Sequence, residues 1–474
     1  MSEYKPTIGL EVHAELSTRT KMFCDSLNDP DEKHPNVNVC PVCMGHPGTL
    51  PVPNKGAIER VVKLGIALEG TPNKLSRFDR KNYFYPDLPK GYQISQSGQP
   101  LVLGGTLRGV KINHIHLEED AGKLVHDDAT DATLVDYNRA GVPLMELVTE
   151  PDLHSAEDAV AFMKELQLVL RYLGVSDADL ERGQMRADAN ISVSLGDTLG
   201  TRAEVKNLNS FNSVFQAINY EIARQTEILE KGEKVHQETR GWDDAKQKTT
   251  AQRSKEEAQD YRYFPEPDMP PFETAVLGLE ALRDTIPELP AAKRLRFASE
   301  YKLDSKQAEI LVGEPETAVF FEEAVSELRE RLPNAPVATL YNYLTSDLRG
   351  LMNQKSVAFV DLKIDPEHLA HLAGLIEEKK ITSRQAKDML VKMFDTGLDP
   401  EDIAKNENIG VSSDSAEIEA VVLAVIAENK AAADDYRKGK TASMQFLIGK
   451  AMGQLKGRAQ PDTLKDLFEK NLKA

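Results

Sequence analysis

The chain has 474 residues, of which 28% are charged and 41% hydrophobic, and its formal net charge is −18. The length predicts two or more domains, and the composition is ordinary for a folded protein. The negative charge argues against a general nucleic-acid coat, so any RNA contact needs local basic patches. No apolar run is long enough to span a membrane, and the N-terminus lacks the apolar segment of a signal peptide. Three cysteines, an odd number, predict a reducing, cytoplasmic setting.

Residues 7–16 alternate between apolar and polar side chains, which predicts a half-buried strand. Glu11 and His13 share the polar parity, so they stand side by side, about 7 Å apart along the strand. A carboxylate next to an imidazole suits a divalent metal ion and leaves positions open for phosphate or water. The alternative interpretation is a polar outer face with no ligand.

Two later segments place carboxylates where burial is otherwise apolar. In residues 114–123, Glu119 continues the apolar parity, and in residues 143–150, Glu146 lies between apolar neighbours of its own parity. A lone ionised carboxylate at such a position would be costly to bury. Three strands of this kind predict a shared divalent site. Salt bridges to nearby Arg or Lys side chains remain an open alternative.

Polar residues follow strand spacing again between residues 186 and 206. One parity of two predicted strands carries Arg186, Asp188, Asn190 and Ser192 on the first strand and Arg202, Glu204 and Lys206 on the second. So much fixed charge on one face predicts a cradle for a phosphorylated or acidic substrate, with Arg and Lys clamping phosphate. A surface ion-pair ladder is the alternative.

Two further segments, residues 77–93 and 260–264, combine cations and aromatic rings with loop-forming residues; the first contains Lys81 and Tyr83. Both could contact a nucleotide or an RNA end by stacking and cation–π contact. Either could equally be a structural loop.

The pattern changes near residue 270. The proline-rich run 264–272 cannot continue a helix or a central strand, and apolar residues beyond residue 290 recur with helical spacing. We therefore predict an α+β protein with a β-rich domain at 1–290, a helical domain at 291–411 and a helical tail at 412–474.

The predicted tail contains a local reversal of charge. Residues 437–458 contain six Lys or Arg and no Asp or Glu, and Gly449, Gly453 and Gly457 recur every four residues. This pattern predicts a surface that an RNA backbone can approach closely. Glycines used for helix packing are the alternative.

The chain closely resembles the family of B subunits of bacterial glutamyl/aspartyl-tRNA amidotransferases. The resemblance rests on residues 8–13, 78–86, 117–123, 136–139, 181–190, 204–211 and 260–268. It implies a glutamine-synthetase-like catalytic cradle within a heterotrimer, whose A and C subunits are the partners and whose A subunit is an amidase that frees ammonia from glutamine. It also implies that ATP and Mg phosphorylate the Glu or Asp misacylated onto tRNA(Gln) or tRNA(Asn), after which ammonia displaces the phosphate. A tRNA-binding adaptor and a free-standing carboxylate–amine ligase are the competing hypotheses.

The resemblance also assigns site residues. It implies Mg ligands at Glu11, His13, Glu119 and Glu146, with Glu118 and Glu150 as nearby alternatives. Together with these four ligands, Arg186 and Lys206 are expected to act in catalysis. The residues expected to bind ATP are Lys81, Tyr83, Arg186, Asp188, Asn190, Arg202, Glu204 and Lys206.

Cys40 and Cys43 form a CxxC knuckle, and Cys24 lies 16 residues upstream. Some relatives have a Cys-x-Cys before the knuckle and bind structural zinc through four thiolates. Here Ser26 stands where the second of those cysteines would be. A tetrahedral zinc site could be completed by Asp25, His34 or His46. A metal-free loop is the alternative.

Overall fold

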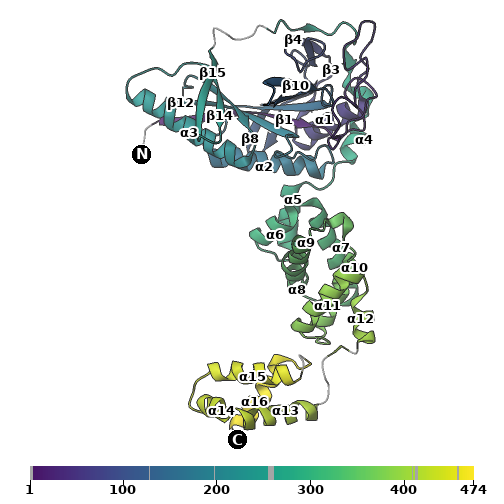
Figure 1. The fold of residues 1–474 in the computed structure, drawn as a ribbon, viewed down its shortest axis with the longest axis vertical. Helices are drawn as coiled ribbons and strands as arrows, with labels where there is room; N and C mark the ends of the chain where they lie inside the picture. Colours follow the sequence, from purple (N-terminus) through teal and green to yellow (C-terminus); the bar gives the residue numbers. More distant parts are fainter. Residues whose placement is uncertain are drawn as a thin grey trace. The chain divides into compact units, whose positions relative to one another are not determined.

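The computed structural model describes residues 4–127, 129–196, 198–254, 261–407, 409–410, 415–455 and 458–473. The chain divides into two compact units, Met1–Ala292 and Lys293–Ala474, which Figure 1 shows in sequence colours. Each unit is described by itself. The predicted further division of the second unit at residue 412 stays a prediction.

The first unit is built on a large, mainly antiparallel sheet. Among the described residues the sheet has ten strands, and only the pair β13–β14 is parallel. Along the sheet the strands are β15 (Lys248–Ser254), β14 (Glu238–Asp243), β13 (Ala203–Leu208), β12 (Met185–Leu195), β1 (Tyr4–Glu15), β11 (Pro143–Thr149), β8 (Val110–Glu119), β6 (Val102–Leu103) and β2 (Thr71–Pro72), with β7 (Thr106–Leu107) also paired to β8.

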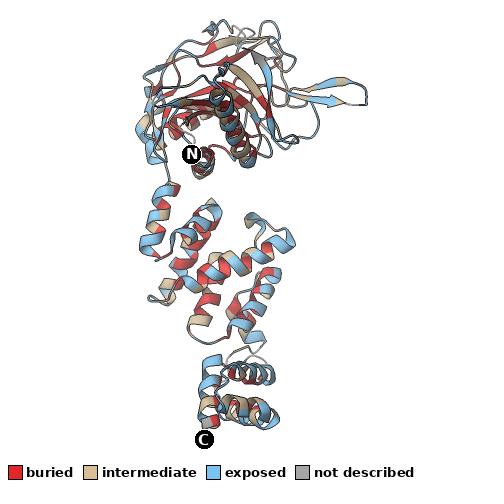
Figure 2. Cartoon of the chain, turned by 90° about the vertical axis from the view of Figure 1, so that its left-hand side faces the viewer, coloured by how far each residue is buried: buried red, intermediate tan, exposed pale blue. Residues whose placement is uncertain are grey.

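Helices cover one face of this sheet. Figure 1 shows α2 (Ala156–Tyr172) and α3 (Phe211–Glu230) along that face, and α1 (Lys55–Ala67) packs near β8. Each helix starts at a polar N-cap whose side chain accepts a backbone N–H; these caps are Asn54 for α1, Ser155 for α2 and Ser210 for α3. The apolar parity of β1 and the inner sides of the helices form one hydrophobic core. Figure 2 shows this buried layer. The other parity of β1 therefore faces away from the core.

Smaller sheets surround the polar face. The strands β4 (Asp79–Asn82), β5 (Tyr92–Ser95) and β16 (Phe264–Pro265) form one sheet, and β3 (Leu75–Ser76) pairs with β17 (Phe272–Glu273). A hairpin of β9 (Lys123–Asp127) and β10 (Ala132–Asp136) is largely exposed. The unit ends with a 3₁₀ turn, Thr274–Leu277, and α4 (Leu279–Asp284).

The second unit is helical. Its helices are α5 (Pro290–Glu300), which begins in the first unit, α6 (Ser305–Val312), α7 (Pro315–Arg331), α8 (Ala338–Asn342), α9 (Arg349–Lys355), α10 (Pro366–Glu377), α11 (Ser383–Thr396), α12 (Pro400–Asn406), α13 (Ser415–Glu428), α14 (Lys430–Arg437), α15 (Ala442–Gln454) and α16 (Pro461–Lys473). A π-helical turn, Tyr343–Leu348, joins α8 to α9, and a 3₁₀ turn spans Phe359–Asp361. The helices α13–α16 share a hydrophobic cluster.

The chain thus combines a large sheet with a helical C-terminal region, in agreement with the predicted α+β class. Among the described residues, no helix has both the length and the apolar character needed to cross a membrane.

Candidate active site

Strand register gathers the polar side chains on the face of the sheet away from the helices. His13 of β1 lies opposite Glu146 of β11 and opposite Arg186 of β12, and Glu146 lies opposite His116 of β8. Directly paired residues project from the same face of a sheet. Four neighbouring strands therefore bring their polar parity together, although the residues are far apart in the sequence.

A first cluster combines two imidazoles with two carboxylates. His13 Nε2 lies 3.1 Å from Glu146 Oε2 and 3.8 Å from Glu118 Oε1. His116 Nε2 lies 3.3 Å from Glu146 Oε2 and 3.8 Å from Glu118 Oε2. Although burial favours the neutral imidazole, Glu146 and Glu118 raise the pKa of His116 to about 10. The protonated His116 therefore supplies positive charge to both carboxylates.

The donor atoms of His13, Glu118 and Glu146 fit a divalent ion. They lie within 4.8 Å of one another. Two ligands of one ion with bonds of about 2.0–2.5 Å are at most about 5 Å apart. Imidazole nitrogen and carboxylate oxygen are both ordinary ligands of divalent ions.

A second acidic cluster lies beside the first. Ligand atoms of Glu11, Asp188 and Glu204 also lie within 4.8 Å of one another. Lys206 Nζ is 2.5 Å from Asp188 Oδ2 and 3.0 Å from Glu204 Oε1, and Asn190 Nδ2 donates to Glu11 Oε1 at 2.8 Å. Burial, and then repulsion from Glu146 of the first cluster, raise the pKa of Glu11. The two clusters therefore interact electrostatically.

The structure separates Glu119 from the cluster in which we expected it. Successive residues of a strand face opposite sides, so Glu118 faces the cluster and Glu119 faces the other side, where it lines a cavity beside Lys90. The Glu119 carboxylate accepts from Lys90 Nζ at 2.5 and 2.6 Å and from Ile94 N at 2.9 Å. The salt-bridge alternative therefore describes Glu119. Glu150, the other alternative ligand, accepts from Asn113 Nδ2 at 2.6 Å.

The sequence prediction did not include His116 in the cluster, and it named Glu118 only as an alternative ligand. A signal was present, because His116 and Glu118 share the polar parity of residues 114–123. The prediction instead chose Glu119, which lies on the apolar parity. Of the four expected ligands Glu11, His13, Glu119 and Glu146, the structure brings His13 and Glu146 together with Glu118, and it places Glu11 in the neighbouring cluster.

The four cations expected to bind ATP have different surroundings. Arg186 Nη2 donates to the buried Asp120 carboxylate at 2.8 Å, and Lys206 is held by the second cluster. Arg202 is exposed and lines a pocket of about 270 Å³ together with Glu11 and Asn190.

Lys81 has no carboxylate within 4 Å in the part of the chain that the structure describes, and its Nζ lies 5.1 Å from the Tyr261 ring centre. Despite burial, the negative charge of Glu118 raises the pKa of Lys81. Lys81 is therefore a charged side chain beside the first cluster. Burial raises the pKa of Tyr83, whose ring packs against that of Tyr261 with centres 5.8 Å apart. Asp260, at the start of the second aromatic segment, lies outside the described residues.

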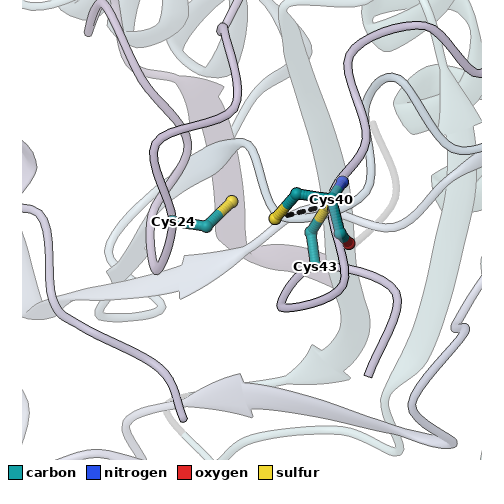
Figure 3. A group of neighbouring side chains, drawn as sticks. All are labelled: Cys24, Cys40 and Cys43. Atoms are coloured by element: carbon teal, nitrogen blue, oxygen red, sulfur yellow. Dashed lines mark hydrogen bonds between the residues drawn. The ribbon is translucent and has the colours of Figure 1, made fainter. Parts of the chain in front are cut away.

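The three cysteines also come together, as Figure 3 shows. Their Sγ atoms lie within 4.8 Å of one another, and among the described residues no Asp, Glu or His joins the group. The expected fourth ligands are therefore not brought to it. The exposed imidazole of His34 contacts Glu32 at 2.9 Å, and His46 lines a neighbouring cavity.

Comparison with known proteins identifies the family. A family model described as the GatB/GatE catalytic domain matches residues 6–276, and one described as the GatB domain matches residues 319–472. The chain belongs to the GatB family. Both acidic clusters and the cysteine group lie within the match to the catalytic domain of this family.

Curated GatB relatives cover the full chain. The protein of Thermotoga petrophila is 44% identical over 99% of both chains. The Brevibacillus brevis protein is 42% identical over 100% of this chain and 99% of its own. The Thermus thermophilus protein is 45% identical over 98% of both. All three are named as the B subunit of aspartyl/glutamyl-tRNA(Asn/Gln) amidotransferase.

Proposed function

We propose that this GatB-family chain is the B subunit of a tRNA-dependent amidotransferase, a ligase that forms carbon–nitrogen bonds. Its substrates are then Glu-tRNA(Gln), Asp-tRNA(Asn) or both, with ATP and ammonia. The observation that carries the proposal is the paired acidic clusters on one sheet face, in a chain similar over its full length to proteins of that name. A cradle fold like that of glutamine synthetase is part of the proposal.

The reaction needs activation before amidation, because a carboxylate is a poor acyl donor. The γ-phosphoryl group of ATP passes to the side-chain carboxylate of the aminoacyl group, which releases ADP and forms an acyl phosphate. Ammonia then attacks the carbonyl carbon, the bond to phosphate breaks, and the nitrogen loses a proton. Phosphoryl transfer of this kind relies on positioning and on positive charge more than on a covalent nucleophile.

The first cluster suits that requirement. His13, Glu118 and Glu146 would hold Mg²⁺, which supplies positive charge for the phosphoryl group. Lys81 adds a second positive charge beside the same carboxylates. Among the described residues no carboxylate lies within 4 Å of Lys81, so its ammonium group is available to contact phosphate oxygens.

The second cluster and its pocket suit the nucleotide. Glu11, Asn190 and Arg202 line the pocket of about 270 Å³, and the exposed Arg202 guanidinium can clamp phosphate. Lys206 holds Asp188 and Glu204 in place. Arg186 is anchored by the Asp120 carboxylate. Tyr83 lies in the aromatic group beside Lys81 and offers a stacking surface.

Ammonia is proposed to come from an amidase, the A subunit, in a heterotrimer that is completed by the C subunit. The three cysteines of this chain lie together at the knuckle, and among the described residues none of them belongs to an acidic cluster. The cytoplasm is the proposed setting, because misacylated tRNA and ATP are both available there.

The tail is proposed to bind the tRNA body. A Cβ built on Gly449 or Gly453 of α15 meets no atom within 4 Å, which favours an open surface over helix packing. Of the basic residues, Arg437 and Lys440 pair with acids at 3.1 Å and Arg458 with Glu417 at 2.9 Å. Lys450 packs on the Phe446 ring. Lys456 and Gly457 lie outside the described residues.

The test is amidation of purified Glu-tRNA(Gln) and Asp-tRNA(Asn) by this chain together with its two proposed partner subunits. Formation of Gln-tRNA or Asn-tRNA that requires ATP and glutamine supports the proposal. Glu146→Gln removes one charge from the first cluster and should abolish amidation while tRNA binding and glutamine hydrolysis persist. Full amidation by Glu146→Gln would instead indicate an adaptor. Amidation of free glutamate without tRNA would indicate a small-molecule ligase.

A further inference from the structure

The three-cysteine group has the spacing of a metal site. Cys43 Sγ lies 3.9 Å from Cys40 Sγ, and all three Sγ atoms lie within 4.8 Å of one another. In a tetrahedral site with zinc–sulfur bonds of about 2.3 Å, neighbouring sulfurs are about 3.8 Å apart. The knuckle also donates the Cys40 backbone N–H to Cys43 Sγ at 3.1 Å. Such a donor stabilises a sulfur that carries negative charge.

A buried lysine lies beside the sulfurs. Lys21 is completely buried, and its Nζ lies 3.9 Å from Cys43 Sγ and donates to the Tyr137 carbonyl at 3.1 Å. Among the described residues, no carboxylate lies within 4 Å of this ammonium. A buried charge needs an opposite charge nearby. Three thiolates around one divalent ion would carry a single negative charge, and the position of Lys21 Nζ beside Cys43 Sγ suits a cation that neutralises it.

Among the residues that the structure describes, the group offers three metal ligands and no fourth of the usual kinds. Among the described residues no His, Asp, Glu or further Cys shares the spacing of the three sulfurs. Ser26 Oγ lies 4.0 Å from Cys43 Sγ, on the segment that also carries Cys24. A cavity of about 200 Å³ is lined by Cys24 and Cys43 together with polar groups that include His46. Solvent can therefore reach the sulfurs from this side.

We propose that Cys24, Cys40 and Cys43 bind one zinc ion through three thiolates, with Lys21 as the neutralising cation and a water molecule from the cavity as the fourth ligand. Such a site is open where a four-thiolate site is closed. Its zinc is consequently exchangeable, and its fourth position can accept an external ligand such as a thiol. This inference does not depend on the proposed amidotransferase activity.

The test uses the full-length chain, stripped of metal under reducing conditions and titrated with Co²⁺ as the spectroscopic probe for zinc. We expect one Co²⁺ per chain, tetrahedral visible bands, and sulfur-to-cobalt absorbance that corresponds to three thiolates. Zinc should displace the cobalt and protect all three thiols from modification. No cobalt uptake, or three thiols that react equally with and without zinc, would overturn the proposal.

Ser26→Cys supplies the missing thiolate without removing any native ligand. We expect its sulfur-to-cobalt absorbance to rise by about one third. We also expect its zinc affinity, measured in competition with a chelator, to rise by about tenfold or more, because each added ligand strengthens a structural site. Ser299→Cys, which adds a thiol on the exposed surface of α5, is the matched control and should match the parent chain. A Ser26→Cys variant with the absorbance and zinc affinity of that control would overturn the open-site assignment, because a thiolate introduced 4.0 Å from Cys43 Sγ would then have found no free position on the metal.

Discussion

Two adjacent glutamates provide a sharp test of which face of β8 carries the active site. Glu118→Gln and Glu119→Gln each remove one negative charge and keep the size of the side chain. The structure puts the first at the metal-type cluster and the second against Lys90 on the opposite side of β8. The two variants should therefore fail in different ways.

The loss of stability is expected to be larger for Glu119→Gln. The side chains of Glu119 and Lys90 are 5% and 10% exposed, so the substitution leaves a buried ammonium without its anion. Breaking a buried ion pair costs about 3–5 kcal/mol. The amide oxygen of the introduced glutamine can still accept from Ile94 N, which favours the lower end of that range. At roughly 2–4 °C per kcal/mol, a loss of 3 kcal/mol lowers the Tm by about 6–12 °C.

The same substitution at Glu118 has a different balance. Glu118 attracts His13 and His116 but is repelled by Glu146, so removing its charge also relieves repulsion. We expect a cost of about 1–2 kcal/mol, which is typical of a single polar substitution. Removing a ligand of the proposed metal should lower ATP-dependent amidation by at least about 100-fold.

Differential scanning calorimetry of the purified chain measures the first effect. The amidation assay with both partner subunits, run well below both Tm values, measures the second. Two results together would refute the assignment of Glu118 to the cluster and of Glu119 to the ion pair. The first is a Glu119→Gln variant with the parent Tm. The second is a Glu118→Gln variant whose Tm falls by about 6 °C or more, which is the smallest fall expected from breaking the buried pair.

Two further predictions concern Glu15 and the tail. Burial, and then Asp120, raise the pKa of Glu15 to about 8 from a usual 4.5, so the folded state favours its protonated form. The contribution of Glu15 to the free energy of unfolding is complete below pH 4.5 and is lost as the pH rises towards 8. In urea unfolding at several pH values, Glu15→Gln should therefore show a smaller fall in stability over this range. An unchanged pH dependence of stability would contradict the prediction. Deleting residues 412–474 should raise the KM for misacylated tRNA and flatten its salt dependence without changing glutamine hydrolysis by the partner. Equal tRNA affinity across a salt titration would make the tail structural.

Local sequence pattern was sufficient for the strand that carries the site. Alternation in residues 7–16 places Glu11 and His13 on the polar side of β1, and the structure buries Ile8, Leu10 and Val12 on the other. The spacing of the knuckle likewise put Cys40 and Cys43 together. Both inferences hold because neighbouring side chains of a strand or a tight turn are placed by backbone geometry alone.

Which carboxylates meet was decided only by the tertiary structure. Parity shows that Glu118 and Glu119 face opposite sides but not which side holds the ligands. The side that holds the ligands is set by strand pairing, which places His13 opposite Glu146 and Glu146 opposite His116. The first pair is separated by more than a hundred residues in the sequence and the second by about thirty. The partners of Arg186 and Lys206, and the burial of Lys21 beside the cysteines, are set in the same way. Register and core packing depend on the whole sheet, because a slip of one residue would turn every side chain of a strand to the other face.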